Sequence, residues 1–306
     1  MRKAFIDTLC DLAEKDDHIW LLTADLGFSV LEKFAEKFPA RYINVGVAEQ
    51  NMAGIAAGIA LSGGTVFIYS IANFPVFRCL EQIRNDICYH NLNVKIVSVG
   101  AGMAYGSAGY SHHGIEDMGV MRLMPNMTVV SPADPVETKL VTTAIARHPG
   151  PCYLRLGKAS EQALHQKQPD FDLSKAIICR EGAHITLAAT GSVLEMAIEA
   201  AEQIKMQGFQ AEIISIPVIK PFDAQTILKS IHKTGRIITM EEHCLGGLAT
   251  VVAETIAGIK CRFSSFLLKQ PPITVAANQK QLMKMHGLTL NSLLETAKKM
   301  LANQID

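Results

Sequence analysis

The sequence lacks an excess of charge of either sign. Its 306 residues include 29 Lys and Arg and 29 Asp and Glu, so the formal net charge is zero. A chain without an overall field does not attract nucleic acid or an anionic membrane at long range. We therefore expect no nucleic-acid partner and no membrane partner, and any bound anion must be held by a few individually placed residues.

The sequence also lacks paired cysteines. Its seven cysteines are odd in number and widely scattered, and none belongs to a C-x-x-C pair. This distribution argues against a disulfide framework and against a zinc knuckle. It favours a reducing compartment, so we expect the protein to be cytoplasmic.

Neither an export signal nor a membrane span is expected. The opening MRKAFIDTLCDLAEKDD places acids within the first helical turns instead of a long apolar core. The stretch 52–77 contains no charge and is long enough to cross a bilayer, but Ser62, Gly63 and Gly64 interrupt it. We interpret this stretch as a buried helix, a turn and a buried strand.

What the sequence does contain is an alternation of β-like runs with segments of helical period. The first series of β-like runs lies at 18–25, 42–45, 65–70, 94–100, 127–134 and 152–157. A polar stretch follows, and a second series lies at 184–190, 211–219 and 235–242. The alternation predicts an α/β fold of two domains, 1–170 and 171–306, each a mostly parallel sheet flanked by helices.

Polar loops follow five of the expected strands of the first domain. Parallel sheets bind ligands beyond the carboxyl ends of their strands, so these loops are candidate site segments. The loop 100–117 is long and glycine-rich and carries two adjacent histidines, which is typical of a functional loop. Its glycines do not match a dinucleotide fingerprint, because no apolar helix follows them. Adjacent histidines diverge, so we expect no metal site on this chain.

Glu49 stands in the first turn of an expected helix of small residues. The helix dipole favours a glutamate there by roughly 0.3–1 kcal/mol, so a capping role would explain Glu49 taken alone. The residues around it indicate a more specific role.

Motifs along nearly the whole chain resemble those of the transketolase family. Those of the first domain resemble the pyrimidine-binding domain and include FPARYINVGVAEQNMAGIAAGIAL, LEQIRND, SHHGIEDMGVMRLMPNMTVVSPADPVE and YLRLGK. Those of the second resemble the transketolase C-terminal domain and include ITLAATGSVLEMAIEAAEQI and EEHCLGGLATVVAE. The resemblance implies that thiamine diphosphate is the cofactor, and it identifies 1–170 and 171–306 with these two domains.

The resemblance implies two catalytic residues and several cofactor contacts. Glu49 matches the glutamate that bonds the aminopyrimidine and drives deprotonation of the thiazolium carbon, and His112 matches a histidine that faces the reacting carbons. Tyr69 resembles the aromatic residue that lies against the pyrimidine, with Phe74 as a rival. Asp25 resembles an aspartate near the subunit interface.

The resemblance also implies a site for a substrate phosphate. Arg2, Ser29 and Arg155 fall where transketolases hold that group, and arginine can bind phosphate through two hydrogen bonds. His113, which replaces a glutamine of the family, is placed with these substrate residues. Asp25 and Arg155 could instead serve only as interface or capping residues.

Other cationic residues have a simpler interpretation. Arg78 and Arg84 are expected to be ion-pair partners of Glu81 on one helix.

One family motif is absent. Full transketolases carry a GDG motif that binds magnesium and the diphosphate, and this sequence has no GDG. We therefore expect the C-terminal subunit of a split transketolase, with an N-terminal subunit that carries GDG and Mg²⁺, in a heterotetramer of two copies of each chain. Alternatives are the beta chain of a 2-oxo-acid dehydrogenase, a deoxyxylulose-phosphate synthase-like enzyme, and a non-catalytic assembly subunit.

Two positions depart from the family and concern the donor substrate. Ala108 stands where ordinary transketolases have an aspartate that recognises a donor hydroxyl, and Gly100 where they have a substrate-facing histidine. A site without these groups loses the discrimination that they provide. We expect a donor other than xylulose 5-phosphate or relaxed stereochemistry, with a modified sugar or a short 2-oxo acid as possible donors.

Overall fold

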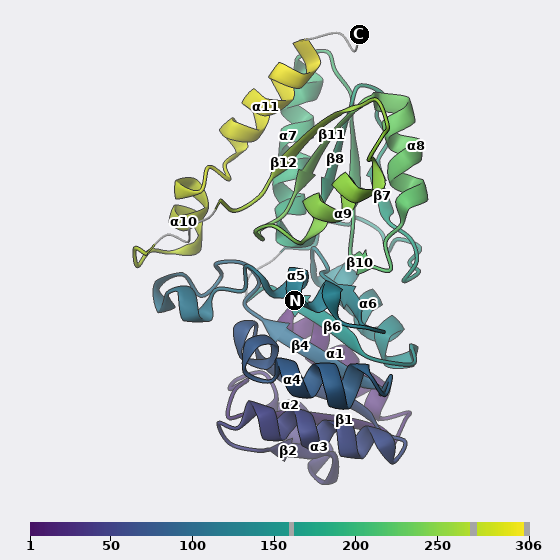
Figure 1. The fold of residues 1–306 in the computed structure, drawn as a ribbon, viewed down its shortest axis with the longest axis vertical. Helices are drawn as coiled ribbons and strands as arrows, with labels where there is room; N and C mark the ends of the chain where they lie inside the picture. The colour runs from purple at the N-terminus through teal and green to yellow at the C-terminus, as the bar shows by residue number, and fades with distance from the viewer. Residues whose placement is uncertain (159–161, 270–273, 303–306) are drawn as a thin grey trace.

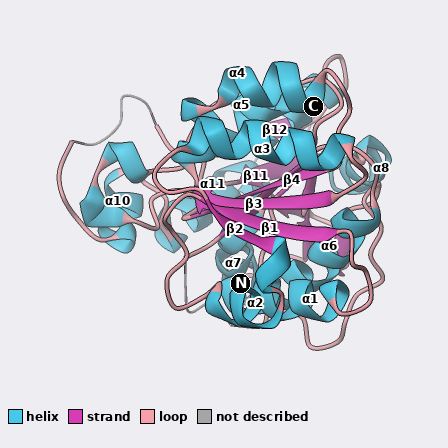
Figure 2. Ribbon diagram, turned by 90° about the horizontal axis from the view of Figure 1, so that it is seen from below, coloured by secondary structure: helices cyan, strands magenta, loops and turns pink. Residues whose placement is uncertain are grey.

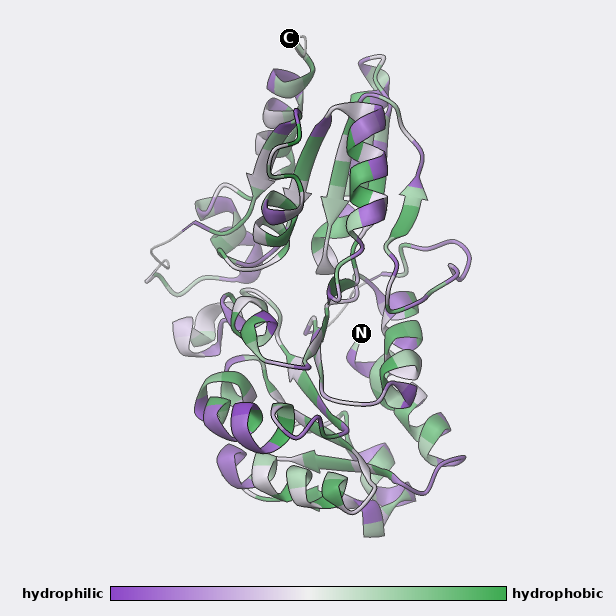
Figure 3. Cartoon of the chain, turned by 45° about the vertical axis from the view of Figure 1, so that its right-hand side comes forward, coloured by the Kyte–Doolittle hydropathy of each residue, from purple (hydrophilic) through white to green (hydrophobic). Residues whose placement is uncertain are grey.

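The computed structural model describes residues 1–158, 162–269 and 274–302. Two sheets lie one above the other in Figure 1, and each is flanked by helices. The expected α/β fold with two mostly parallel sheets is confirmed. Figure 3 shows that the strands are mostly hydrophobic and that many helical turns are hydrophilic on their outer side.

The first sheet has seven strands in the order β10-β5-β6-β4-β3-β1-β2, and all neighbours are parallel except β10 and β5. The strands are β1 (Ile19–Thr23), β2 (Tyr42–Asn44), β3 (Thr65–Ile71), β4 (Val94–Val99), β5 (Thr128–Val130), β6 (Cys152–Leu156) and β10 (Val218–Lys220). The central strand β4 is buried along its whole length, which explains its continuous run of VKIVSV.

Helices cover both faces of this sheet (Figure 2). One face packs against α1 (Arg2–Ala13), α2 (Glu32–Lys37) and α6 (Pro135–Arg147). The other packs against α3 (Glu49–Leu61), α4 (Leu80–Gln82) and α5 (Asp117–Leu123). Short helical turns complete the domain: η1 (Pro39–Arg41), η2 (Phe74–Arg78), η3 (Ile83–Cys88), η4 (Gly106–Ala108) and η5 (Tyr110–His112).

The second sheet has five strands in the order β12-β11-β8-β9-β7, of which only β7 is antiparallel among the strands described. The strands are β7 (Ile177–Arg180), β8 (Ile185–Ala189), β9 (Ala211–Ser215), β11 (Arg236–Met240) and β12 (Arg262–Phe266). The turn η6 (Gly191–Val193) leads into α7 (Leu194–Met206), which with α11 (Leu290–Ala302) covers one face. The helices α8 (Ala224–Thr234) and α9 (Leu248–Thr255) cover the other, and α10 (Gln279–Met285) extends towards the first domain.

One strand crosses between the two sheets. The sequence predicts a single strand over 211–219, but the structure divides it into β9 in the second sheet and β10 in the first. The division falls at Ile216 and Pro217: the Ile216 amide still bonds to Ala189 of the second sheet, and the Pro217 carbonyl accepts from Ser131 of the first. Proline has no amide to continue the ladder, so the chain changes partner there. The boundary at residue 170 stays a prediction, and beyond it β10 still belongs to the first sheet.

The uncharged stretch 52–77 forms most of α3, a turn at Ser62 to Gly64, and β3, as predicted, but α3 is buried on one face only and exposes Gly54, Gly58 and Leu61 on the other. None of the helices in the described parts of the chain is both long and apolar enough to cross a bilayer.

Candidate active site

The candidate site residues are carried by loops at the carboxyl edge of the first sheet. The chain runs from β1 outward to β2 and returns to the other side of β1 for β3, so the strand order reverses beside β1. Ligands of open α/β sheets bind at such a reversal. The loops after β1, β2, β3, β4 and β6 carry Ser29, Glu49, Phe74, His112 and Lys158 respectively.

Glu49 is the first residue of α3, and its side chain is only 5% exposed. The Arg78 guanidinium donates a hydrogen bond from Nη1 to Glu49 Oε1 at 2.6 Å. The same guanidinium lies 3.8 Å from the centroid of the Phe74 ring. Arg78 therefore occupies the space between an almost buried carboxylate and an aromatic ring, beside a cavity of about 400 Å³.

This arrangement corrects the interpretation of the two arginines. Arg78 pairs with Glu49, not with Glu81, and Arg84 donates to the Asn85 side chain. The expected ion pairs failed because η2 turns Arg78 towards the start of α3, 29 residues earlier in the chain.

His112 also contacts Phe74. The two rings meet edge to face with centroids 5.2 Å apart, and the Tyr105 ring lies 6.1 Å from His112. His112 Nδ1 is 3.0 Å from the Ser111 hydroxyl, and its side chain is half-buried. A continuous series of contacts thus joins Glu49 through Arg78 and Phe74 to His112.

Tyr105 fills the space beside Gly100. A Cβ atom added to Gly100 would lie 2.1 Å from Tyr105 Cε2, and Gly100 has a φ of +94°. Position 100, which the resemblance matches to a histidine of the family, can therefore carry no side chain here unless Tyr105 moves. Burial raises the pKa of Tyr105, although Arg2 nearby opposes this shift.

A cationic cavity adjoins Tyr105. It has a volume of about 430 Å³ and brings together Arg2 and Ser29, two of the residues predicted to hold a phosphate. Lys158 also lines it, with Nζ 4.6 Å from the centroid of the Tyr105 ring. We name this cavity the Arg2 cavity.

Three lysines line the Arg2 cavity, and two of them are already paired. Lys3 and Lys33 each donate to Asp7 at 2.5 Å. Arg2 and Lys158 are therefore better placed to meet an anionic ligand. The sequence interpretation missed Lys158, although this lysine ends the YLRLGK motif, two residues after the buried strand β6.

Arg155 lies elsewhere. Its side chain is 2% exposed, and Nε donates to Asp117 Oδ2 at 2.8 Å. One of its terminal nitrogens donates to the carbonyl oxygens of Gly114 and Glu242, which belong to the two different domains. The structure therefore places Arg155 between the domains and not on the surface of the Arg2 cavity.

The groups around Arg155 form a buried charged cluster. Burial by itself raises the pKa of Asp117, but Arg155 and His243 outweigh it, so the pKa lies below its usual value. Burial raises the pKa of Glu241 to about 7, although Glu241 accepts hydrogen bonds from the Leu248 and Ala249 amides at the start of α9. Burial lowers the pKa of His243 to about 4.

The remaining predicted site residues, Tyr69, His113 and Asp25, lie in three different environments. Tyr69 is 3% exposed, stacks on Phe5 with centroids 6.1 Å apart, and has its pKa raised by burial. His113 is 3% exposed and its Nε2 lies 2.9 Å from the Gly106 carbonyl, so it braces the loop that carries His112. Asp25 is exposed in the turn after β1, where its amide donates to Asn44 at 2.9 Å. The structure places Phe74, not Tyr69, in contact with both His112 and the arginine that pairs with Glu49.

Comparison with known proteins identifies the family. Residues 1–162 match the model of the transketolase pyrimidine-binding domain, and residues 174–293 match that of the transketolase C-terminal domain. A subunit of the apulose-4-phosphate transketolase of Phocaeicola vulgatus is 39% identical over 84% of this chain and 83% of its own length. A subunit of the 6-deoxy-6-sulfo-D-fructose transketolase of Clostridium sp. is 37% identical over 84% of this chain and 80% of its own length.

A solved structure matches this chain in length as well as in fold. A split gene transketolase, described as an inactive beta4 tetramer, superposes with a TM-score of 0.88 at 33% identity and covers 98% of this chain and 97% of its own. The similarity thus extends over both domains and ends with them. The chain belongs to the transketolase family and corresponds to the C-terminal, or beta, subunit of a split transketolase.

Proposed function

We propose that this chain supplies the pyrimidine-activating and substrate-binding half of a thiamine diphosphate-dependent ketol-transfer site. The observation that carries this proposal is the position of Arg78 between Glu49 and Phe74. Arg78 is a flat cationic group that donates a hydrogen bond to the carboxylate and stacks on the ring. An aminopyrimidine is also flat and also offers hydrogen-bonding nitrogens, so the residues present fit that half of the cofactor.

The chain's own residues have separate roles in this proposal. Glu49 holds the proton that the aminopyrimidine exchanges, and Phe74 provides the apolar surface against it, while Asp25 and Tyr69 remain candidates for outer contacts. The chemistry that thiamine diphosphate supplies when bound is an acidic thiazolium carbon that accepts the two-carbon unit. His112 faces the reacting carbons and moves a proton to or from a substrate hydroxyl. Arg2, Ser29 and Lys158 hold an anionic group of the substrate, and His113 supports the loop.

A partner subunit completes the site. The described residues contain no group of three or more His, Cys, Asp or Glu side chains placed to hold a metal ion, and the sequence has no GDG motif. We therefore assign Mg²⁺ and the diphosphate to a separate N-terminal subunit with that motif. The beta4 tetramer of the split gene relative is inactive, which is consistent with a chain that needs its partner.

The exposed face of α3 suits such an assembly. Nothing lies within 4 Å of a Cβ atom built on Gly54 or Gly58, and Val47 and Leu61 are 73% and 69% exposed. Glu49 begins this helix, so a subunit packed on α3 would also close over Glu49. We propose a heterotetramer of two copies of each chain. The odd number and scattered positions of the cysteines favour a cytoplasmic location.

The donor is proposed to be a modified sugar. Tyr105 occupies the place of the family's histidine at Gly100, and Ala108 offers no group to a donor hydroxyl. The relatives act, by their names, on apulose 4-phosphate and 6-deoxy-6-sulfo-D-fructose, which are not the standard ketose. A 2-oxo acid donor, as in the dehydrogenase and deoxyxylulose-phosphate synthase alternatives, remains the second candidate.

One experiment tests both the partner and the donor. The chain is assayed alone and together with a candidate N-terminal subunit that carries the GDG motif, against xylulose 5-phosphate, modified ketoses and pyruvate. We expect no turnover and no magnesium-dependent cofactor binding by the chain alone, and turnover of a modified ketose by the pair. Tight cofactor binding by the chain alone would overturn the split site. Efficient and stereospecific use of xylulose 5-phosphate would overturn the donor proposal.

A further inference from the structure

A second cavity lies at the reversal of strand order in the other sheet. The chain runs from β8 to β9 on one side and then crosses back to β11 on the other side of β8. The carboxyl ends of β8 and β11 therefore border a crevice of the kind in which open α/β sheets bind ligands. Ser192 and Val193 follow β8, Glu242 follows β11, and all three line a cavity of about 520 Å³. None of these three residues has a role in the proposed ketol transfer.

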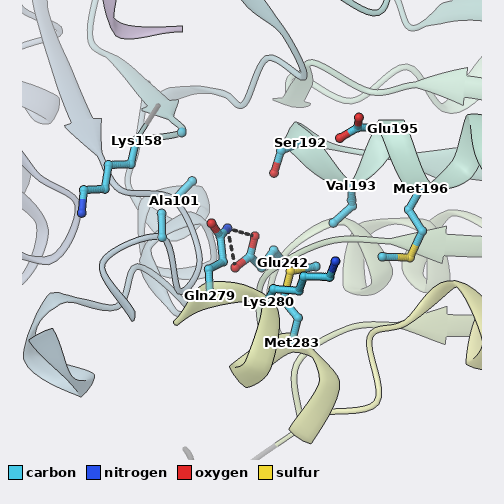
Figure 4. Close-up of a pocket in the computed structure, with 12 residues that line it drawn as sticks. Ala101, Lys158, Ser192, Val193, Glu195, Met196, Glu242, Gln279, Lys280 and Met283 are labelled. Atoms are coloured by element: carbon cyan, nitrogen blue, oxygen red, sulfur yellow. Dashed lines mark hydrogen bonds between the residues drawn. The ribbon is translucent and has the colours of Figure 1, made fainter. Parts of the chain in front are cut away.

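Elements from both domains enclose this cavity, which we name the Glu242 cavity. Ala101, Ala104 and Gly157 come from loops of the first domain, while Gln279 and Met283 come from α10 (Figure 4). Its volume is within the range of about 300–1,000 Å³ that small-molecule sites occupy. The cavity is thus a cleft between the two domains and not a feature of one loop.

The floor of the cavity is polar and fixed in place. Glu242 is 3% exposed and accepts hydrogen bonds from Gln279 Nε2 at 2.8 and 3.1 Å and from the Met103 amide at 2.8 Å. The Gln279 side-chain nitrogen already donates to Glu242, so the side-chain oxygen of Gln279 is the atom that can accept a hydrogen bond from a ligand. Figure 4 shows the Ser192 hydroxyl directed towards this pair from the opposite wall. The three groups together favour a ligand with several hydroxyls.

The charged and apolar groups of the lining restrict the chemical class of the ligand further. Lys158 and Lys280 balance Glu195 and Glu242, so the lining has no net charge, in contrast to the cationic Arg2 cavity. Among the described residues that line it, none carries an aromatic ring on which a nucleobase could stack. Met196 and Met283 offer adaptable apolar surface to carbon–hydrogen faces. We propose that the Glu242 cavity is an effector site for a small uncharged polyhydroxylated molecule, a free monosaccharide or a sugar alcohol.

The cavity is connected to the loop that carries His112. Glu242 holds the Met103 amide, and a Cβ atom on Gly106 would lie 2.7 Å from the Ala277 carbonyl just before α10. Met103 and Gly106 flank Tyr105 in the loop 100–117. Lys158 lines both cavities. A ligand bound to Gln279 therefore contacts the side chains that hold the segment around Tyr105 and His112, and it adds to the restraint on that segment.

Binding to the full-length chain alone tests the site without any dependence on ketol transfer. The probes for calorimetry are D-ribose and D-glucose as ring forms and xylitol as a linear form, with inorganic phosphate and adenosine monophosphate as contrasts. Ser192→Leu fills the cavity from one wall, and Gln279→Leu removes the amide from the other. We expect at least one polyol to bind, and each variant to weaken it by about tenfold or more. Arg2→Gln, in the Arg2 cavity, should leave polyol binding unchanged.

Two outcomes would overturn the proposal. One is a failure of the binding test: no polyol binds the wild-type chain saturably, or polyol binding is unchanged in both Ser192→Leu and Gln279→Leu. The other is that phosphate, not a polyol, binds in a manner that Ser192→Leu abolishes. Hydrogen exchange of residues 103–115 tests whether the Glu242 cavity is connected to the loop that carries His112. Bound polyol should slow exchange of these amides in the wild type and not in Ser192→Leu. Unchanged exchange in the saturated wild type would overturn the effector role.

Discussion

Arg78 Nη1 lies 2.6 Å from Glu49 Oε1, and this ion pair occupies the place where the proposed site needs its carboxylate accessible. The Glu49 side chain is 5% exposed, while that of Arg78 is 46% exposed, so Arg78 can swing out and Glu49 cannot. We infer that Arg78 covers Glu49 in the free chain and leaves it when the cofactor and the partner arrive.

This covering role predicts that Arg78→Leu strengthens cofactor binding in the reconstituted complex. The cofactor then no longer competes with an ion pair, and a partly exposed pair contributes up to about 1 kcal/mol, or roughly fivefold in affinity. Titration of thiamine diphosphate followed by fluorescence measures the change. Arg84→Leu is the matched control, since Arg84 contacts Asn85 instead. Weaker binding by Arg78→Leu would mean that Arg78 is itself a ligand.

A second prediction separates catalysis by Glu49 from capping of α3. Glu49→Gln should reduce turnover of the complex by about 10²- to 10⁴-fold, because a positioned proton-transfer group contributes that much. Assembly, measured by gel filtration, should be preserved. The exposed Glu81 provides the control variant Glu81→Gln, which should retain full turnover. A lowered melting temperature with unchanged turnover would assign Glu49 to capping alone.

A third prediction concerns the contact between Tyr105 and Gly100. Gly100→Ala should destabilise the isolated chain for two reasons, a φ of +94° and a Cβ atom 2.1 Å from Tyr105. The left-handed conformation alone costs about 1–2 kcal/mol, and overpacking adds about 1–3 kcal/mol. Gly63→Ala is the control for a positive φ, since Gly63 has a φ of +96° and no described atom lies within 4 Å of a Cβ built on it.

Denaturant unfolding of Gly100→Ala, Gly63→Ala and the double variant Gly100→Ala/Tyr105→Ala measures these contributions. The loss in Gly100→Ala should exceed that in Gly63→Ala, and removing the Tyr105 ring should recover the difference. Equal losses at the two glycines would show that Tyr105 moves aside freely, and the donor argument based on its position would then lose its support.

A fourth prediction follows from the burial of Glu241. Burial raises the pKa of Glu241 to about 7 from an ordinary value near 4.5. A carboxyl with a raised pKa stabilises the fold fully below its unfolded pKa, and this contribution is lost as the pH rises through the folded value. Between about pH 4.5 and pH 7 the free energy of unfolding should therefore lose roughly 3 kcal/mol from this group.

Glu241→Gln should remove that pH-dependent part, as measured by urea unfolding at pH 4.5, 6 and 7.5. Glu199→Gln, an exposed variant on α7, should follow the wild-type pH profile. A wild-type pH profile in Glu241→Gln would show that Glu241 stays ionised, held by the amides of α9.

The sequence was sufficient for most of the fold and for part of the site. Its β-branched runs and the loops after them identified six strands of the first sheet, because periodicity is a local property. It did not identify β7, β12 or α10, because these segments are short or lie beside polar residues. It also did not identify the change of sheet at Pro217. That change depends on contacts with Ser131, which no local pattern reports.

The site shows the same division between local and distant information. Motifs identify Glu49, His112, Arg2 and Ser29. The structure connects Glu49 to His112 through Arg78 and Phe74, and it places Arg2 and Ser29 on one cavity. The pairing of Arg78 with Glu49 spans 29 residues and could not be read from helical spacing. Whether Arg155 or Lys158 is available to hold the substrate phosphate depends on which of them the second domain covers. That depends on how β6 packs against the second domain, which the sequence does not show.

The fifth prediction tests this choice. Lys158→Gln should raise KM for a phosphorylated substrate by about tenfold or more, because a charge-assisted hydrogen bond contributes about 1.5–3 kcal/mol, and leave stability unchanged. Arg155→Gln should instead lower the melting temperature, since it leaves Asp117 buried without its partner at a cost of about 3–5 kcal/mol. Lys15→Gln, on an exposed lysine after α1, controls for loss of charge. A raised KM in Arg155→Gln with an unchanged melting temperature would return Arg155 to the phosphate site, and an unaffected KM in Lys158→Gln would remove Lys158 from it.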